Sequence, residues 1–257
     1  MMQGLYTETV GQGPDLLLVH GWGMHGGVWG KFVELLARRF RVRLVDLPGH
    51  GHSPMPSGQA WVDAVLDAAP PIAHWLGWSL GAQIALHAAA VRPERVKSLS
   101  MLCGNPCFAE RSDWPTAMAP ALLEGFRASV ESSGVGALPR FLALQAQGLP
   151  QPRSLLKRMQ GLLGQRPAPA RQALLAGLQL LHSYDLRAAL TELQCPVLAL
   201  LGANDALVPV ALGEALRQLK PDLRLEVLAG SAHQPFFSHP MECAGLVEAF
   251  LLAHDGD

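Results

Sequence analysis

Charged residues, cysteines and long apolar runs are all scarce in this sequence of 257 residues. Only 16% of the residues are charged and the formal net charge is −1, which gives no overall attraction to nucleic acid. The sequence contains no CxxC pair, Walker loop or GxGxxG segment, so we expect neither a metal nor another cofactor. The cysteine spacing is unlike a disulfide framework and predicts reduced packing residues at Cys103, Cys107, Cys195 and Cys243.

The amino terminus lacks a basic segment followed by an apolar run and a small-residue cleavage site, which predicts no secretory signal and a cytoplasmic location. The least charged stretch, Trp75 to Val91, is interrupted by glycines and by polar Ser79 and Gln83, which favours strand, turn and helix over a membrane span. We therefore expect contact with neither membrane nor nucleic acid, and separately we expect a monomer.

In the first hundred residues, short apolar runs alternate with segments of helical apolar spacing. Such alternation is typical of a mostly parallel, doubly wound α/β sheet with helices on both faces. Strands are expected at 5–10, 15–20, 41–46, 72–78 and 96–102, with helices at 29–39, 60–69 and 80–92.

Between about residues 109 and 187 this alternation stops, because β-branched runs disappear, proline recurs and helical spacing dominates. It resumes with strands at 195–202 and 223–228 and helices at 209–219 and 240–254. The prediction is an α/β core formed by residues 1–108 and 188–257, interrupted after its sixth strand by a helical cap over residues 109–187.

The most informative motif is Gly77-Trp78-Ser79-Leu80-Gly81, a G-x-S-x-G pattern where an expected strand meets an expected helix. A sharp turn of this kind exposes a serine hydroxyl at the helix start, where backbone N–H groups and the helix dipole stabilise an anion. Glycines on either side let neighbouring segments close around the serine. Ser79 is therefore a candidate nucleophile, with a simple helix N-cap as the alternative.

An acid and a histidine follow Ser79 in the chain order typical of the α/β-hydrolase fold. Asp205 comes just after the expected strand 195–202, and His233 lies between the last strand and the last helix. The carboxyl ends of parallel strands meet at one edge of a sheet, so we expect these side chains to meet there. In this hypothesis Ser79 attacks a carbonyl, His233 transfers the proton and Asp205 orients the imidazole. The alternative is a loop aspartate and a surface histidine.

An oxyanion formed in such a reaction needs N–H donors. The backbone N–H groups of Leu80 and of Trp22 are the candidates, although the segment His20-Gly21-Trp22-Gly23 could also be a plain glycine-rich turn.

His50 and His52 have the spacing of metal ligands but no third ligand nearby. Structural or surface roles are expected for the other candidates, namely Asp46, His50, His52, His74, His87, His182 and His239.

The expected cap carries an excess of positive charge. Residues 109–187 contain nine Lys or Arg and five Asp or Glu, a net charge of +4. Leu155 and Met159 share one face of an expected helix, with Arg153 and Lys157 on the opposite face. These cations either are ordinary solvated side chains or attract an acidic macromolecular substrate, and the pattern leaves both open.

Several segments distributed along the chain match one known pattern. They are His20 to Gly23 with Val28-Trp29, Leu44 to Gly49, Trp75 to Gly81, Pro106 to Phe108 with Asp113 to Pro115, and Arg140-Phe141-Leu142-Ala143-Leu144-Gln145. The last segment is the most diagnostic. Over essentially its whole length the chain thereby resembles the pimeloyl-acyl-carrier-protein methyl ester esterase family of biotin synthesis.

The resemblance implies hydrolysis of the methyl ester of pimeloyl-carrier protein to methanol and a free carboxyl group. It also implies that Trp22 and Leu80 contact the acyl substrate. By the same resemblance, the acyl pocket is lined by Phe141, Leu142, Ala143, Leu144 and Gln145, and the acidic acyl-carrier protein is met by Arg140, Arg153 and Lys157.

Two departures from the family pattern would weaken docking of the carrier protein. Lys157 stands in place of an arginine, and Gly136 in place of a further basic residue. Two other functions remain open at this point: a broad carboxylesterase or thioesterase acting on small free esters, and a hydrolase-like binding protein without activity.

Overall fold

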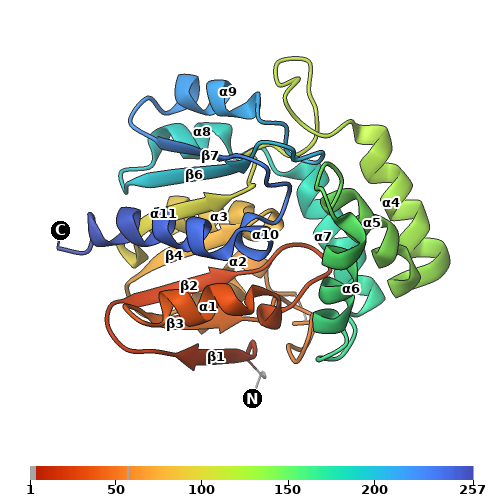
Figure 1. Cartoon of the computed structure of the whole chain (residues 1–257), viewed down its shortest axis with the longest axis horizontal. Helices are drawn as coiled ribbons and strands as arrows, with labels where there is room; N and C mark the ends of the chain where they lie inside the picture. Colours follow the sequence, from red (N-terminus) through yellow and green to blue (C-terminus); the bar gives the residue numbers. More distant parts are fainter. Residues whose placement is uncertain (1–3, 57, 257) are drawn as a thin grey trace.

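The computed structural model describes residues 4–56 and 58–256. At its centre is a seven-stranded sheet in the order β1-β3-β2-β4-β5-β6-β7, in which β1 pairs antiparallel with β3 and the other neighbours pair in parallel (Figure 1). The predicted strands are all present, with ends within two residues of those expected. They are β1 (Thr7–Val10), β2 (Asp15–Val19), β3 (Arg41–Val45), β4 (Ala73–Trp78), β5 (Val96–Leu102), β6 (Val197–Gly202) and β7 (Arg224–Leu228).

The sheet separates two apolar clusters because successive side chains of a strand point to opposite faces. In β2, Leu16 and Leu18 join one cluster, while Leu17 and Val19 join the other. Helices cover both faces (Figure 1). The first cluster includes residues of α1 (Lys31–Leu36), α10 (Pro235–Ser238) and α11 (Pro240–Leu252), and the second those of α2 (Trp61–Ala68), α3 (Leu80–Val91), α8 (Arg187–Glu192) and α9 (Leu212–Leu219).

The helix expected over 29–39 is shorter than predicted. A 3-10 turn, Gly26–Trp29, ends at Gly30, whose φ of 48° is not helical, and α1 begins only at Lys31. The short helices α8 and α10 were not predicted. With six and four residues, these helices make fewer than two turns, which leaves no helical period to recognise in the sequence.

The predicted helical cap lies at one end of the sheet (Figure 1). It rests on the carboxyl ends of the strands, since the Trp22 indole, just beyond β2, donates to the Leu174 carbonyl of the cap at 2.8 Å. The cap follows β5, the fifth strand, so its expected place after a sixth strand was wrong: in the described residues only β1 precedes the first parallel strand. Its helices are α4 (Pro120–Ser133), α5 (Leu138–Gln145), α6 (Pro152–Leu163) and α7 (Arg171–Ser183).

Each of α4, α5 and α6 has proline in its first two positions, where the missing N–H group breaks no helical hydrogen bond. Three of the recurring prolines of this region, Pro120, Pro139 and Pro152, therefore mark helix starts. Within residues 4–56 and 58–256, no helix is both long enough and apolar enough to cross a bilayer.

Candidate active site

The G-x-S-x-G segment forms a tight strand-to-helix turn. β4 ends at Trp78 and α3 begins at Leu80, so Ser79 alone makes the turn, with a φ of 55°. A Cβ on Gly77 would overlap the carbonyl oxygen of Gly81, and a Cβ on Gly81 would overlap that of Val19, so both glycines are required by close backbone approach. A non-glycine residue at positive φ costs about 1–3 kcal/mol, a strain that is commonly found at functional turns.

Ser79 lies where the strand order of the sheet reverses direction. β2 has β3 on one side and β4 on the other, and the carboxyl ends at such a switch point are where open α/β sheets bind their ligands. A Cβ on Gly21, in the turn after β2, would lie 3.3 Å from Ser79 Cβ. The structure therefore brings Trp22 and Leu80, the two predicted sources of oxyanion N–H groups, to the immediate neighbourhood of Ser79.

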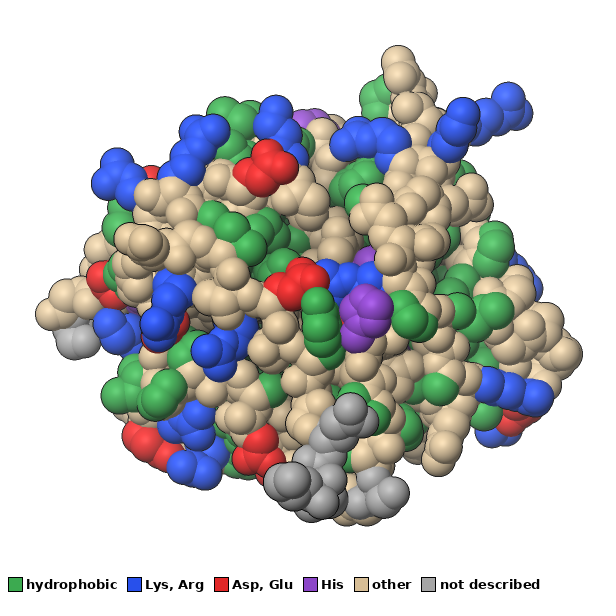
Figure 2. Space-filling model, turned by 90° about the horizontal axis from the view of Figure 1, so that it is seen from below, with side chains coloured by type: hydrophobic (Ala, Val, Ile, Leu, Met, Phe, Trp, Pro, Cys, Tyr) green, Lys and Arg blue, Asp and Glu red, His purple; other side chains and the backbone are tan. Residues whose placement is uncertain are grey.

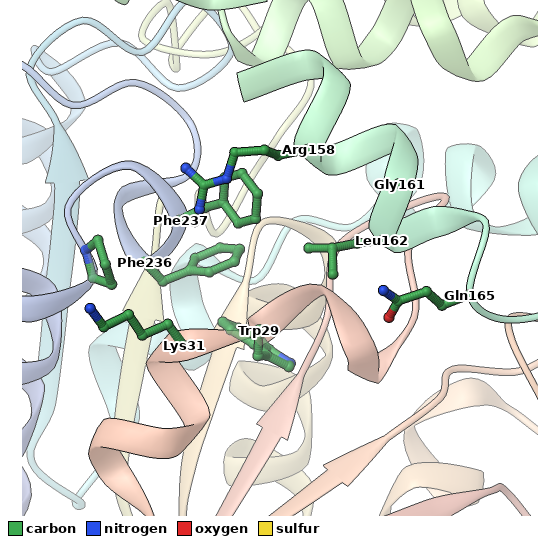
Figure 3. Close-up of a pocket in the computed structure, with 10 residues that line it drawn as sticks. Trp29, Lys31, Arg158, Gly161, Leu162, Gln165, Phe236 and Phe237 are labelled. Atoms are coloured by element: carbon green, nitrogen blue, oxygen red, sulfur yellow. The ribbon is translucent and has the colours of Figure 1, made fainter. Parts of the chain in front are cut away.

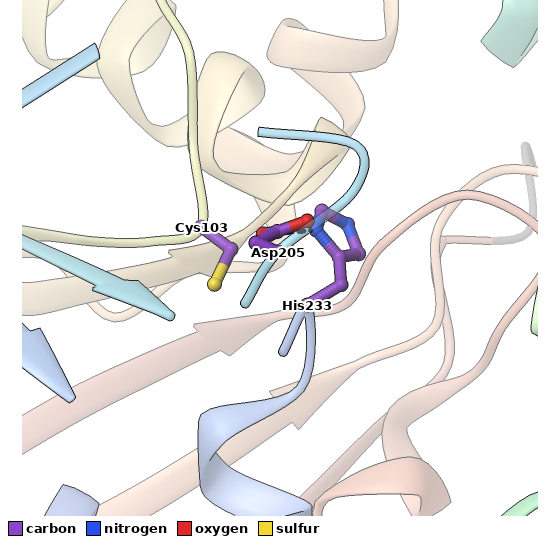
Figure 4. A group of neighbouring side chains, drawn as sticks. All are labelled: Cys103, Asp205 and His233. Atoms are coloured by element: carbon purple, nitrogen blue, oxygen red, sulfur yellow. Dashed lines mark hydrogen bonds and ion pairs between the residues drawn. The ribbon is translucent and has the colours of Figure 1, made fainter. Parts of the chain in front are cut away.

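Asp205 and His233 form a buried hydrogen-bonded pair, with their facing side chains drawn in Figure 4. His233 Nδ1 lies 2.8 Å from Asp205 Oδ2, and both side chains are 0% exposed. Asp205 Oδ1 accepts from the backbone N–H groups of Leu207 and Val208 at 2.8 and 3.0 Å. The carboxylate is thus fixed by three donors, and an Nδ1–H tautomer leaves Nε2 of His233 able to accept a proton.

The loop carrying His233 is fastened to the serine turn by Trp78. The Trp78 indole N–H donates to the His233 carbonyl at 2.7 Å, and the two rings lie with centroids 5.7 Å apart. Ser79 Oγ and His233 Nε2 are both buried and have no hydrogen-bond partner among the described residues. Buried polar atoms normally have partners, so these two atoms are available for each other, for water or for a substrate.

Helix α5 places part of the predicted acyl-binding segment beside this site. Phe141 packs edge-on against Trp22 with ring centroids 4.7 Å apart, and Leu142 is buried. Gln145 accepts a hydrogen bond from Gln234, the residue after His233. Ala143 is exposed and Leu144 half-buried, because five consecutive helical residues cannot all share one face.

A surface hollow of about 380 Å³ lies next to the site but is not the site itself (Figure 3). Its lining includes the aromatic Trp29 and Phe236 and the cationic Lys31 and Arg158. Neither Ser79 nor His233 lines it, and these residues are only 2% and 0% exposed. The candidate active site is therefore closed from solvent in this structure.

Asp46 has the structural role that its position predicted. It accepts hydrogen bonds from the backbone of Gly26 at 2.6 Å and His52 at 2.9 Å, and pairs at 2.8 Å with Arg166 from the loop between α6 and α7. Two histidines nearby are buried, and burial lowers the pKa of His20 to about 3 and that of His50 to about 4. Both are therefore neutral at pH 7 and serve packing and hydrogen bonding rather than charge.

The other histidines considered in the sequence also occupy structural or surface positions. His74 is buried in β4 and bonds to Ser98 Oγ at 2.8 Å and to Asp255 at 3.2 Å, while His87 packs on Tyr184 with ring centroids 5.3 Å apart. His52 and His182 are exposed, and His239 is half-buried at the start of α11.

One cluster in the described residues has the composition of a metal site. Potential ligand atoms of Cys103, Asp205 and His233 lie within 4.8 Å of one another. Asp205 and His233 already bond through Oδ2 and Nδ1, so a cation would have to replace that pair. All four cysteines are free, as predicted, but the position of Cys103 beside the pair was not foreseen.

The cations predicted to meet a partner lie on the cap surface. Arg140, Arg153 and Lys157 are exposed, and the Arg140 guanidinium lies 5.9 Å from the centroid of the Phe126 ring. Arg166, by contrast, is only 10% exposed, because it pairs with Asp46 and with Glu8. Over the face shown in Figure 2, basic side chains are scattered among acidic ones and do not merge into one continuous area.

Comparison with known proteins agrees with this geometry. Residues 14–240 match the family model described as alpha/beta hydrolase fold. A pimeloyl-[acyl-carrier protein] methyl ester esterase of Methylococcus capsulatus is 49% identical, covering 96% of this chain and 98% of that protein. The enzyme of the same name from Serratia marcescens is 40% identical, covering 98% and 100%. The solved structure of an esterase from Exiguobacterium antarcticum superposes with a TM-score of 0.84 at 22% identity, covering 96% and 95%.

Proposed function

Because the chain belongs to the pimeloyl-[acyl-carrier protein] methyl ester esterase family of the α/β-hydrolase fold, we propose that it hydrolyses the methyl ester of pimeloyl-carrier protein. The products are methanol and pimeloyl-carrier protein with a free carboxylate for biotin synthesis. The observation that carries this proposal is the buried Asp205–His233 pair, 2.8 Å from Oδ2 to Nδ1, tied through Trp78 to the strained Ser79 turn.

In the proposed mechanism, Ser79 Oγ attacks the ester carbonyl while His233 Nε2 takes its proton. Asp205 holds Nδ1 protonated and stabilises the imidazolium, and the N–H groups of Trp22 and Leu80 receive the oxyanion. His233 then gives the proton to the departing methoxide, which leaves as methanol. Water, activated by the same imidazole, hydrolyses the acyl-serine and regenerates the enzyme.

The acyl-carrier protein is the proposed macromolecular partner, and the cap, assigned to residues 109–187 over a core of 1–108 and 188–257, is the proposed docking surface. Arg140, Arg153 and Lys157 support this assignment, because they are exposed on α5, which lies beside the candidate active site, and on α6, which packs against α5. Phe141, Leu142 and Gln145 are the buried residues proposed to contact the acyl chain. The enzyme is expected to act as a monomer, without a cofactor.

The substrate assignment is tested by comparing kcat/KM for pimeloyl-carrier-protein methyl ester with kcat/KM for a short free methyl ester. A strong preference for the carrier-bound compound is expected. Equal values for the two would show a broad esterase instead, and no turnover of either by folded protein would show a binding protein. Growth of a biotin-requiring strain that lacks its esterase, restored by the wild type and not by Ser79→Ala, tests the same assignment in cells.

Docking is tested by reversing charge on the cap. The double variant Arg140→Glu, Lys157→Glu should lower kcat/KM for the carrier-bound ester and leave the short free ester unaffected. The loss should shrink in high salt, because screening weakens interactions between exposed charges. Arg217→Glu, an exposed change on α9, is the matched control. A loss that is equal for both esters or independent of salt would contradict docking through these cations.

A further inference from the structure

Two consecutive residues at the end of β5 bond to the serine turn and to β6, the strand that precedes Asp205. The carbonyl of Leu102 accepts the backbone N–H of Ser79 at 3.0 Å, and the N–H of the next residue, Cys103, donates to Leu200 of β6 at 2.8 Å. Within the described chain, Cys103 and Ser79 are the two non-glycine residues with positive φ, at 43° and 55°. Position 103 therefore carries a side chain although its backbone conformation favours glycine.

The thiol of Cys103 lies against the acid–histidine pair (Figure 4). Its Sγ is within 4.8 Å of the potential ligand atoms of both Asp205 and His233, and it donates to the carbonyl of Ala232 at 3.8 Å. Ala232 directly precedes His233, so this weak bond attaches the histidine loop to the end of β5. Cys103 is 0% exposed and cannot exchange these contacts for water.

The chemistry of a thiol suits this position better than that of a hydroxyl. A thiol is a weak hydrogen-bond donor, so it fills the space beside Asp205 without competing strongly with His233 for the carboxylate. Burial and the nearby Asp205 carboxylate raise the pKa of the thiol well above its usual value, which keeps it neutral. A second negative charge is thus avoided beside Asp205.

We propose that Cys103 is a positioning residue of this enzyme, which holds the His233 loop through Ala232 and leaves the Asp205 carboxylate free to serve His233. This inference rests on the proposed function of the three residues, but not on the identity of the ester. With a φ of 43°, the backbone at Cys103 places the thiol within 4.8 Å of the Asp205–His233 pair.

The test compares Cys103→Ser, Cys103→Ala and Cys103→Gly with a matched control, Cys195→Ser. Cys195 lies just before the start of β6, at the end of the strand opposite to the candidate active site. Cys103→Gly removes the thiol and also relieves the positive φ, so it should fold even if Cys103→Ala does not. Two readouts are used: kcat and KM for a short free ester, and the proton NMR resonance of the hydrogen between His233 Nδ1 and Asp205 Oδ2. The resonance needs no turnover.

In Cys103→Ser, the hydroxyl should donate to Asp205, weaken the bond to His233 and move the resonance upfield. In the Ala and Gly variants, the looser loop should broaden the resonance. All three should lower kcat by about tenfold with little change in KM, less than the hundredfold cost of a misplacement of about 1 Å. A wild-type resonance and kcat in folded Cys103 variants would overturn the proposal, leaving a packing role alone. If the wild-type protein itself showed neither the resonance nor hydrolysis of the ester, the proposed triad would be refuted instead.

Discussion

Replacing Asp205 by asparagine should inactivate the enzyme through the tautomer of His233. Asp205 Oδ1 is bound by the N–H groups of Leu207 and Val208, so the amide oxygen of an asparagine must take that place. Its NH2 group then faces Nδ1 of His233, which has to become an acceptor, and the ring proton moves to Nε2. An Nε2–H group cannot remove the proton of Ser79.

The expected loss in kcat is about 10⁴-fold, the magnitude found when the same change is made in a serine protease triad. Asparagine has nearly the shape of aspartate, so the melting temperature should change little. Ester hydrolysis at pH 7 and a thermal melt of the same samples provide the measurement. Asp46→Asn is the matched control: this buried carboxylate also accepts two backbone N–H groups, and its loss should lower stability while folded protein stays active. An Asp205→Asn enzyme within tenfold of the wild-type kcat would refute the reasoning.

Three further predictions concern stability. Arg166→Met should lower the free energy of unfolding by about 3–5 kcal/mol in urea titrations, because it leaves the Asp46 carboxylate, which is 0% exposed, without its cation. An unchanged urea midpoint would contradict this. Folded His20 and His50, with pKa values of about 3 and 4, bind fewer protons than the unfolded chain below pH 6.5. Stability should therefore be retained above pH 6.5 and fall by up to about 1.4 kcal/mol per pH unit per histidine between pH 6.5 and the folded pKa of each. Equal urea midpoints at pH 7 and pH 5 would speak against this. Gly81→Ala should lower the melting temperature and abolish activity, because its Cβ overlaps the Val19 carbonyl. Gly245→Ala, exposed in α11 with open space around it, should be neutral or stabilising by up to about 1 kcal/mol. Similar melting temperatures for the two variants would disprove the steric account.

The fold could be predicted from local patterns because the core strands are short apolar runs between turns. β2 illustrates this: residues Leu16 to Val19 are all buried, and a continuous apolar run is what a strand covered on both faces requires. The order of Ser79, Asp205 and His233 could also be predicted, since each follows a strand whose carboxyl end lies at the same edge of the sheet.

Contacts between distant residues could not be predicted. The Arg166–Asp46 pair joins residues 120 apart, and the Trp78–His233 bond joins residues 155 apart. No local pattern specifies such partners, because they depend on how the cap and the loops settle on the finished sheet. Cys103 belongs to the same class: its chemistry was visible in the sequence, but its place beside Asp205 follows from the pairing of β5 with β6.

Covalent labelling with a serine-directed fluorophosphonate tests the central claim most directly. Mass spectrometry of the digested protein should find one adduct, on the peptide that contains Ser79. The adduct should be absent in Ser79→Ala, and it should form much more slowly in His233→Ala. Folded wild-type protein that remains unlabelled at Ser79, or that labels at an unchanged rate without His233, would contradict the account.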